Sequence, residues 1–346
     1  MQVQAQAPIE TQELAAVLPI EVTDTGQVLP MPGQRRRGLT APAWVRAVLR
    51  NRKAAVGVMI LILFAVVALL APVLAPGDPR DFVARPHLPP SAEHIFGTTG
   101  QGQDVFSQTV WGGRATLSIG ILVGLLTTVV GIVVGLSAGY FGGITDDVLS
   151  LVTNVFLIIP SLPLLVVLAA FLGSGNALYF VLVLTVTGWA WPARVMRAQT
   201  LSLRTKDFVA AAKVGGESGP RIILAEILPN MLSIVVASFL GSTIFAIGAL
   251  AALEFLGLGN PSAVTWGTNL YWASNNAGLL TGAWWTFVPA GACIALVAFA
   301  FALVNYAIDE LTNPRLRAQR ERTGILKRLP FGRASSRSTP VVNHAG

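Results

Sequence analysis

The sequence predicts an all-α membrane protein with six transmembrane helices, and three observations lead to this fold class. Of its 346 residues, 53% are hydrophobic and 12% are charged, whereas about one-quarter of the residues in an average soluble domain are charged. The apolar residues form blocks of about twenty, the length at which a helix crosses roughly 30 Å of hydrocarbon. Basic residues gather between and beyond these blocks, as they do in proteins that cross a membrane several times.

The first apolar block contains no charged residue and follows a long, glutamine-rich leader. We therefore expect it to remain as an anchor helix and not to be cleaved as a signal peptide. Proline and glycine inside the later blocks are tolerated where packed neighbours take up the freed backbone groups. The six blocks cover residues 54–75, 115–139, 148–172, 177–193, 227–256 and 285–307.

Outside the blocks the chain divides into loops and tails. Residues 1–41 are rich in proline and glutamine without sustained periodicity, which predicts a flexible tail, and residues 318–346 predict a second one. Residues 42–75 comprise the anchor helix and a basic segment before it, which is either a surface helix or a run of flanking charge. The remaining parts are an outer loop at 76–114 and a membrane core at 115–317 that contains a connecting segment at 199–226.

The basic residues predict the orientation in the membrane. Seven lie in residues 35–53, six in 194–221 and eight in 315–337, so 21 of the 24 fall on one side of a six-span chain. That side is the cytoplasm by the positive-inside rule, which places both termini and residues 199–226 there. The excess of basic residues behind the net charge of +7 is therefore explained by membrane topology. The sequence has no motif of aromatic and basic residues that would indicate nucleic-acid binding.

Several function classes are disfavoured by what the blocks lack. Their cores contain no Asp, Glu, Lys, Arg or His, since Glu254 and Asp309 lie at block ends, whereas ion-coupled carriers need ionisable groups within the membrane. No phosphate-binding G-x-x-x-x-G-K-[ST] motif occurs, so ATP-driven work would fall to another subunit. Cys293 is the single cysteine, and the outer-loop residues His87 and His94 match no known metal-site spacing, so we expect no metal.

Two patterns inside the blocks concern packing and a pathway. The second block carries five glycines near one helical face, which favours close helix packing, within this chain or against a similar partner, over a pore-lining role. The third block contains Pro160 and Pro163, which bend or break the helix and indicate either a cavity lining or a static kink. In the fifth block Ser238, Gly241 and Ser242 form a small, mildly polar face that suits a path for an uncharged or zwitterionic solute, although serine can also bond back to its own helix. The five glycines are Gly120, Gly124, Gly131, Gly135 and Gly139.

The last outer loop is rich in tryptophan and asparagine. Trp284 and Trp285, at the mouth of the last block, are typical of interfacial anchors. The aromatic cluster before them is explained most simply by the same anchoring, and alternatively by contact with a soluble binding protein or a sugar. The candidates for that contact are Trp266, Asn269, Tyr271 and Trp272.

The segment between the fourth and fifth blocks carries the most specific pattern. On spacing alone, an alanine-rich helix between Arg204 and Gly216 could be a connector. Its sequence, followed by 227-Ile-Leu-Pro-Asn-230, resembles the EAA loop of permease subunits in ATP-binding-cassette importers. The resemblance implies a coupling helix seated in a cleft of the ATPase. The residues assigned to it are Asp207, Phe208, Ala210, Ala211, Ala212, Gly216 and Arg221.

Further segments resemble the permease branch that serves dipeptides, oligopeptides, opines and nickel. They lie at residues 96–107, 138–143, 255–259 with 266–267, and 309–317. The resemblance covers about residues 40–317 and matches the second permease, which has an anchor span before the type I, MetI-like core. This chain departs from the family at Ala210, where the loop usually has its glutamate, at Glu226 and at Glu254.

The resemblance implies a set of partners and a location. A homologous permease would complete the pathway, two ATPase subunits would bind ATP and Mg²⁺, and a solute-binding protein would deliver a peptide-like or oligosaccharide solute from outside. This chain would bind no cofactor and would lie in a bacterial or archaeal plasma membrane. The alternatives are an ion-coupled secondary transporter and a structural membrane subunit.

Overall fold

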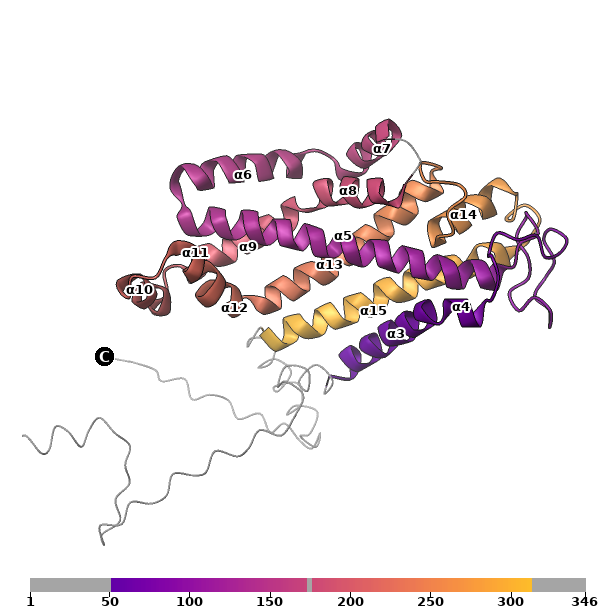
Figure 1. Ribbon diagram of the computed structural model, residues 1–346, viewed down its shortest axis with the longest axis horizontal. Coiled ribbons are helices and arrows are strands. Elements are labelled where there is room, and N and C mark those ends of the chain that lie inside the picture. Colours follow the sequence, from indigo (N-terminus) through magenta and orange to yellow (C-terminus); the bar gives the residue numbers. More distant parts are fainter. Residues whose placement is uncertain (1–50, 173–175, 313–346) are drawn as a thin grey trace, which may run out of the picture. The chain divides into compact units, whose positions relative to one another are not determined.

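The computed structural model describes residues 51–172 and 176–312 (Figure 1). The two predicted tails, the start of the basic segment before the anchor helix and the end of the motif at 309–317 lie outside these residues. The described parts are helical, and their only β-type contact is an isolated bridge between Thr98 and Asp104. The helices are α3 (Arg52–Leu69), α4 (Ala71–Leu74), α5 (Val105–Phe141), α6 (Gly143–Ile158), α7 (Ser161–Leu172), α8 (Ala177–Gly188), α9 (Ala190–Leu203), α10 (Asp207–Val214), α11 (Gly219–Arg221), a π-helical turn (Ile222–Ile227), α12 (Leu228–Asn230), α13 (Leu232–Phe255), α14 (Trp266–Asn275), a 3-10 turn (Trp284–Thr286) and α15 (Val288–Thr312).

The six apolar blocks correspond to four continuous helices and two bent pairs. Helices α3, α5, α13 and α15 are each long and apolar enough to cross a membrane. Helices α6 and α7 meet at 88°, and α8 and α9 meet at 40°, so the described residues provide six spans if each pair counts as one. The predicted all-α, multi-span fold is confirmed.

The bend between α6 and α7 occurs at Pro160. Ile159 is extended, with φ −67° and ψ 125°, as expected for a residue that precedes proline. Pro160 has no N–H to continue the ladder of α6, and its carbonyl instead accepts a hydrogen bond from the Leu164 N–H at 3.2 Å in the first turn of α7. The predicted break is therefore present and changes the direction of the chain.

Helix α5 makes the most extensive helix packing in the described residues, and its glycines allow the close approach of its neighbours. It packs against α9 and α13 more extensively than any other pair of described helices packs. The first two stripe glycines face α13 and the other three face α9; a Cβ on Gly135 would lie 2.5 Å from the Ala193 carbonyl oxygen. The stripe is buried, so the predicted close packing is present, and of its two alternatives the structure shows packing within this chain.

The anchor helix α3 packs along α15, its neighbour in Figure 1. Gly57 brings the backbones together, since a Cβ there would lie 2.7 Å from the Ala300 carbonyl oxygen. At the start of α3, the Lys53 ammonium lies 4.7 Å from the centre of the Tyr306 ring. The anchor is therefore an integral part of the helix bundle.

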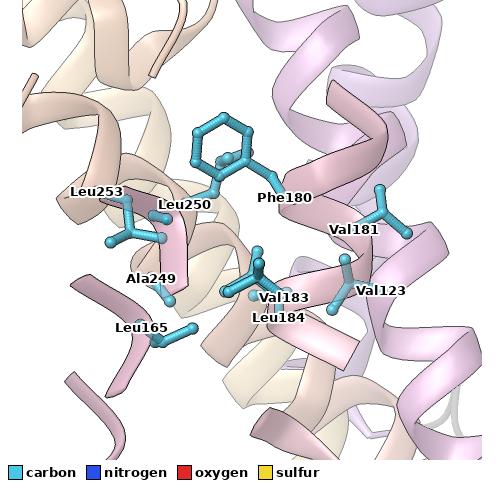
Figure 2. Close-up of a cluster of buried hydrophobic side chains, with 11 residues drawn as sticks. Val123, Leu165, Phe180, Val181, Val183, Leu184, Ala249, Leu250 and Leu253 are labelled. Atoms are coloured by element: carbon cyan, nitrogen blue, oxygen red, sulfur yellow. The ribbon is translucent and has the colours of Figure 1, made fainter. Parts of the chain in front are cut away.

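A buried apolar cluster joins α5, α7, α8 and α13. Figure 2 shows it from Val123 on α5 and Leu165 on α7 to Leu184 on α8 and Leu250 on α13, all of them with no exposed surface. Because α7 contributes to this cluster, it remains attached to the core after the sharp bend. The other labelled members are Phe180, Val181, Val183, Ala249 and Leu253.

Candidate functional site

The alanine-rich segment forms a short helix, α10, with one buried and one open face. Val209 is completely buried and packs in a cluster with Ile222, Ile227 and Met231. On the other face Ala210, Ala211 and Lys213 are exposed, and Val214 is 91% exposed. The helix is thus held firmly from one side while small side chains remain free to contact another molecule on the other.

A left-handed turn follows α10. Gly216 has φ +79°, a conformation that residues with a side chain rarely adopt. The Gly216 N–H donates to the Lys213 carbonyl at 3.1 Å and the Glu217 N–H donates to the Ala212 carbonyl at 3.1 Å. A Cβ on Gly216 would meet nothing within 4 Å, so within this chain the glycine serves backbone geometry. Arg221, further along, pairs with Glu217 on the surface.

Two arginines, one on α9 and one directly after it, attach this segment to the neighbouring helices. Arg197 forms a bidentate ion pair with Asp146 at the start of α6, with Nε to Oδ1 at 2.5 Å and Nη2 to Oδ2 at 2.7 Å. Arg204 Nη1 donates to the Gly139 carbonyl of α5 at 3.1 Å. These contacts fix the end of α9 from which α10 continues. In the sequence these arginines stand out only as topology signals, because nothing near them marks their partners.

Four of the five predicted pathway residues line one cavity. Pro160, Ser238, Gly241 and Ser242 border a cavity of about 690 Å³, here called the serine cavity, and no charged residue lines it. Pro163, on α7, is not among the residues that line this cavity, so its place on a pathway stays a prediction.

The serine cavity also contains a polar residue that the sequence analysis missed. Asn305 of α15 contributes to the lining, and its Oδ1 is buried without a hydrogen-bond partner among the residues that the structure describes. A buried unpaired amide oxygen is costly unless water or a ligand satisfies it. The sequence could have indicated this residue, because Asn305 is a lone asparagine in the last apolar block.

The aromatic loop before α15 is more buried than expected. Trp266 is 1% exposed, and its Nε1 donates to the Thr109 carbonyl of α5 at 2.9 Å. Its assignment as a binding-protein contact is therefore wrong, because its ring fills the helix bundle beside Gly113. The Asn269 side chain also bonds within this chain, since its Nδ2 donates a hydrogen bond to the Gln108 carbonyl at 3.0 Å.

The other two loop candidates keep some surface. Tyr271 and Trp272 are partly buried and stack edge to face with ring centres 5.1 Å apart. Trp272 Nε1 donates to the Pro261 carbonyl at 2.9 Å. Trp284 is 54% exposed, as an interfacial anchor would be.

The histidines of the outer loop have separate partners. His87 Nε2 lies 3.0 Å from the Asn276 carbonyl oxygen, and His94 Nδ1 lies 3.3 Å from Asp104 Oδ1. Within residues 51–172 and 176–312, no three of the side chains His, Cys, Asp and Glu come together as a metal site would require.

Comparison with known proteins identifies the family. Residues 131–318 match the family described as binding-protein-dependent transport system inner membrane component. Residues 43–90 match the N-terminal transmembrane domain of oligopeptide transport permease C. The resemblance inferred from the sequence is thereby confirmed.

Two individual permeases give the same result. The dipeptide transport system permease protein DppC of Bacillus subtilis is 33% identical over 80% of this chain and 86% of its own length. The oligopeptide transport system permease protein OppC of Mycobacterium tuberculosis is 33% identical over 80% of this chain and 95% of its own length. A solved inward-facing MetNI methionine transporter has a chain that is 22% identical, with a TM-score of 0.47 over 61% of this chain and 95% of its own. The chain therefore belongs to the family of binding-protein-dependent transport system inner membrane components, and it is a transport subunit rather than an enzyme.

Proposed function

We propose that this chain is the second permease of an ATP-binding-cassette importer for peptides. The observation that supports it most is the combination of the family with α10, a helix buried on one face and open on the other. On that open face an ATPase subunit would dock, and a related permease would complete the pathway. ATP and Mg²⁺ would bind to two ATPase subunits, with none bound by this chain. A soluble binding protein would deliver the solute from outside.

Peptides are favoured over oligosaccharides as the solute. The relatives named above are dipeptide and oligopeptide permeases. The case for a sugar depended on the tryptophan- and asparagine-rich loop, but there Trp266 is buried and Asn269 is bonded to the backbone of α5. The serine cavity, with hydroxyl and amide groups and no charge, suits the amide backbone of a peptide.

Reconstitution in liposomes tests the function. We expect the permease pair, the ATPases and the loaded binding protein to accumulate a peptide only when ATP is supplied, and to continue when an uncoupler collapses the proton gradient. The reason is that the block cores carry no charged residue to bind a coupling ion. Accumulation driven by a proton or sodium gradient without ATP would show a secondary transporter instead. Accumulation of an oligosaccharide but of no peptide would overturn the solute class.

Labelling of single introduced cysteines tests the orientation. In a Cys293→Ala background we expect Lys213→Cys to be protected from a membrane-impermeant thiol reagent in intact cells, and Ser274→Cys to react. Both positions are exposed in the structure, so protection reports the side of the membrane and not burial. Lys213 lies within residues 199–226, which the positive-inside rule places in the cytoplasm. Reaction at position 213 together with protection at 274 would reverse the topology.

A further inference from the structure

A buried carboxyl group at the end of α13 lacks a counter-charge. Glu254 is 4% exposed, and its Oε2 accepts a hydrogen bond from the Thr265 hydroxyl at 2.6 Å. Within the described residues this is the only hydrogen bond of the carboxyl group, and no basic side chain forms an ion pair with it. Gly259 and Gly267 make room for it, because a Cβ on either would lie 2.8 Å from a carbon of the Glu254 side chain.

The same carboxyl group lines a second cavity of about 660 Å³, here called the Glu254 cavity. Its walls include the apolar residues Ile119, Phe180 and Val264. Arg114 lies at the rim, where it is exposed and stacks over the Trp111 ring at 5.6 Å. The cavity thus has one buried acidic residue, Glu254, and three exposed charged residues of both signs, Asp78, Arg80 and Arg114.

This arrangement favours a ligand with particular chemistry. A buried carboxylate is costly unless it is paired, and this chain supplies one hydroxyl and no cation within the described residues. A primary ammonium group would supply the missing charge through a charge-assisted hydrogen bond. The Arg114 guanidinium at the rim would in turn pair with a carboxylate on the same ligand.

We propose that the Glu254 cavity binds peptide solutes by their two ends, with the amino terminus on Glu254 and the carboxyl terminus toward Arg114. The inference rests on the proposed function and adds an orientation to it. The serine cavity carries no charged lining residue, so end recognition belongs to the Glu254 cavity. Helix α8 borders both cavities, the Glu254 cavity with Ala177 and Phe180 and the serine cavity with Thr187 and Gly188.

The test compares a dipeptide with its N-acetylated form in the reconstituted complete importer. For Glu254→Gln we expect the preference for the free amine to fall about tenfold or more relative to the wild-type chain, the value of one charge-assisted hydrogen bond. The binding protein is the same in both measurements, so its own preference cancels. Glutamine can still accept the hydrogen bond from the Thr265 hydroxyl. The variant therefore removes the charge of residue 254 and keeps its structural contact. Asp81→Asn, an exposed carboxylate of the same outer loop that does not border the Glu254 cavity, is the control and should leave the preference unchanged.

A second variant tests the other end. Arg114→Gln, at an exposed position, should reduce the preference for a free carboxyl terminus over a C-terminal amide. If Glu254→Gln reduces uptake of both dipeptide forms equally, or of neither, the inference is overturned while the proposed function stands. If Glu254→Gln does not assemble, an unchanged preference in Arg114→Gln overturns it. If the wild-type importer takes up no peptide at all, the proposed function fails and the inference fails with it.

Discussion

Substitution of Gly216 by leucine is expected to abolish ATP-dependent uptake while the subunit stays in the membrane. Gly216 has φ +79°, where an L-residue costs about 1–2 kcal/mol, so leucine would distort the turn after α10. Because a Cβ there meets nothing within 4 Å, the leucine side chain would also project toward the surface where we propose that the ATPase docks. Uptake is measured in the reconstituted importer at equal protein levels, together with retention of the ATPase during purification.

Two neighbouring variants separate the causes. Gly215 has φ −69° and a Cβ there makes ordinary contacts at 3.4 Å, so Gly215→Ala should retain the turn and the uptake. Gly216→Asn introduces a residue that tolerates the left-handed backbone region, so this variant should retain more uptake than Gly216→Leu. Normal uptake by Gly216→Leu would indicate that residues 207–221 are only a connector between spans.

Features encoded over short stretches of sequence could be predicted. The helix α10 follows from an alanine-rich run that ends at a glycine pair, and the close packing of α5 follows from glycines repeated on one helical face. In both cases neighbouring residues determine the structure, through helix propensity or through the 3.6-residue period. The break at Pro160 was predicted for the same reason, because proline acts on its own helix.

Features that depend on distant partners could not be predicted. Trp266 bonds to Thr109, 157 residues away, so its sequence context of an outer loop suggested exposure when tertiary packing buries it. Arg197 and Asp146 are 51 residues apart, and each looked like an ordinary charge beside a span. Glu254 was placed correctly at a helix end, but its burial depends on Gly259, Gly267 and the fold of the following loop. Sequence pattern reports which side chains share a helix face, whereas these sites depend on which faces meet.

Substitution of Gly135 by leucine is expected to prevent stable folding of the chain. A Cβ at this position would lie 2.5 Å from the Ala193 carbonyl oxygen and 2.9 Å from the Met196 Cβ. Two of the three nearest atoms belong to the backbone of α9, so no rotamer change can relieve the clash and the two helices must separate. Overpacking of a core costs typically 1–3 kcal/mol, and leucine adds three further carbons beyond the Cβ, so we expect the full upper end of that range or more.

The matched control for Gly135→Leu is Gly248→Leu on α13. Gly248 is exposed and a Cβ there meets nothing within 4 Å, so leucine adds no clash and gains up to about 1 kcal/mol of helix propensity. Thermal unfolding of the purified chain in detergent, with the yield of folded protein, measures both variants. We expect Gly135→Leu to give little folded protein with a strongly lowered Tm, and Gly248→Leu to match or exceed the wild-type Tm. Equal Tm values for the two variants would contradict the packing of α5 on α9, because the same side chain would then be tolerated where the helices touch and where they do not.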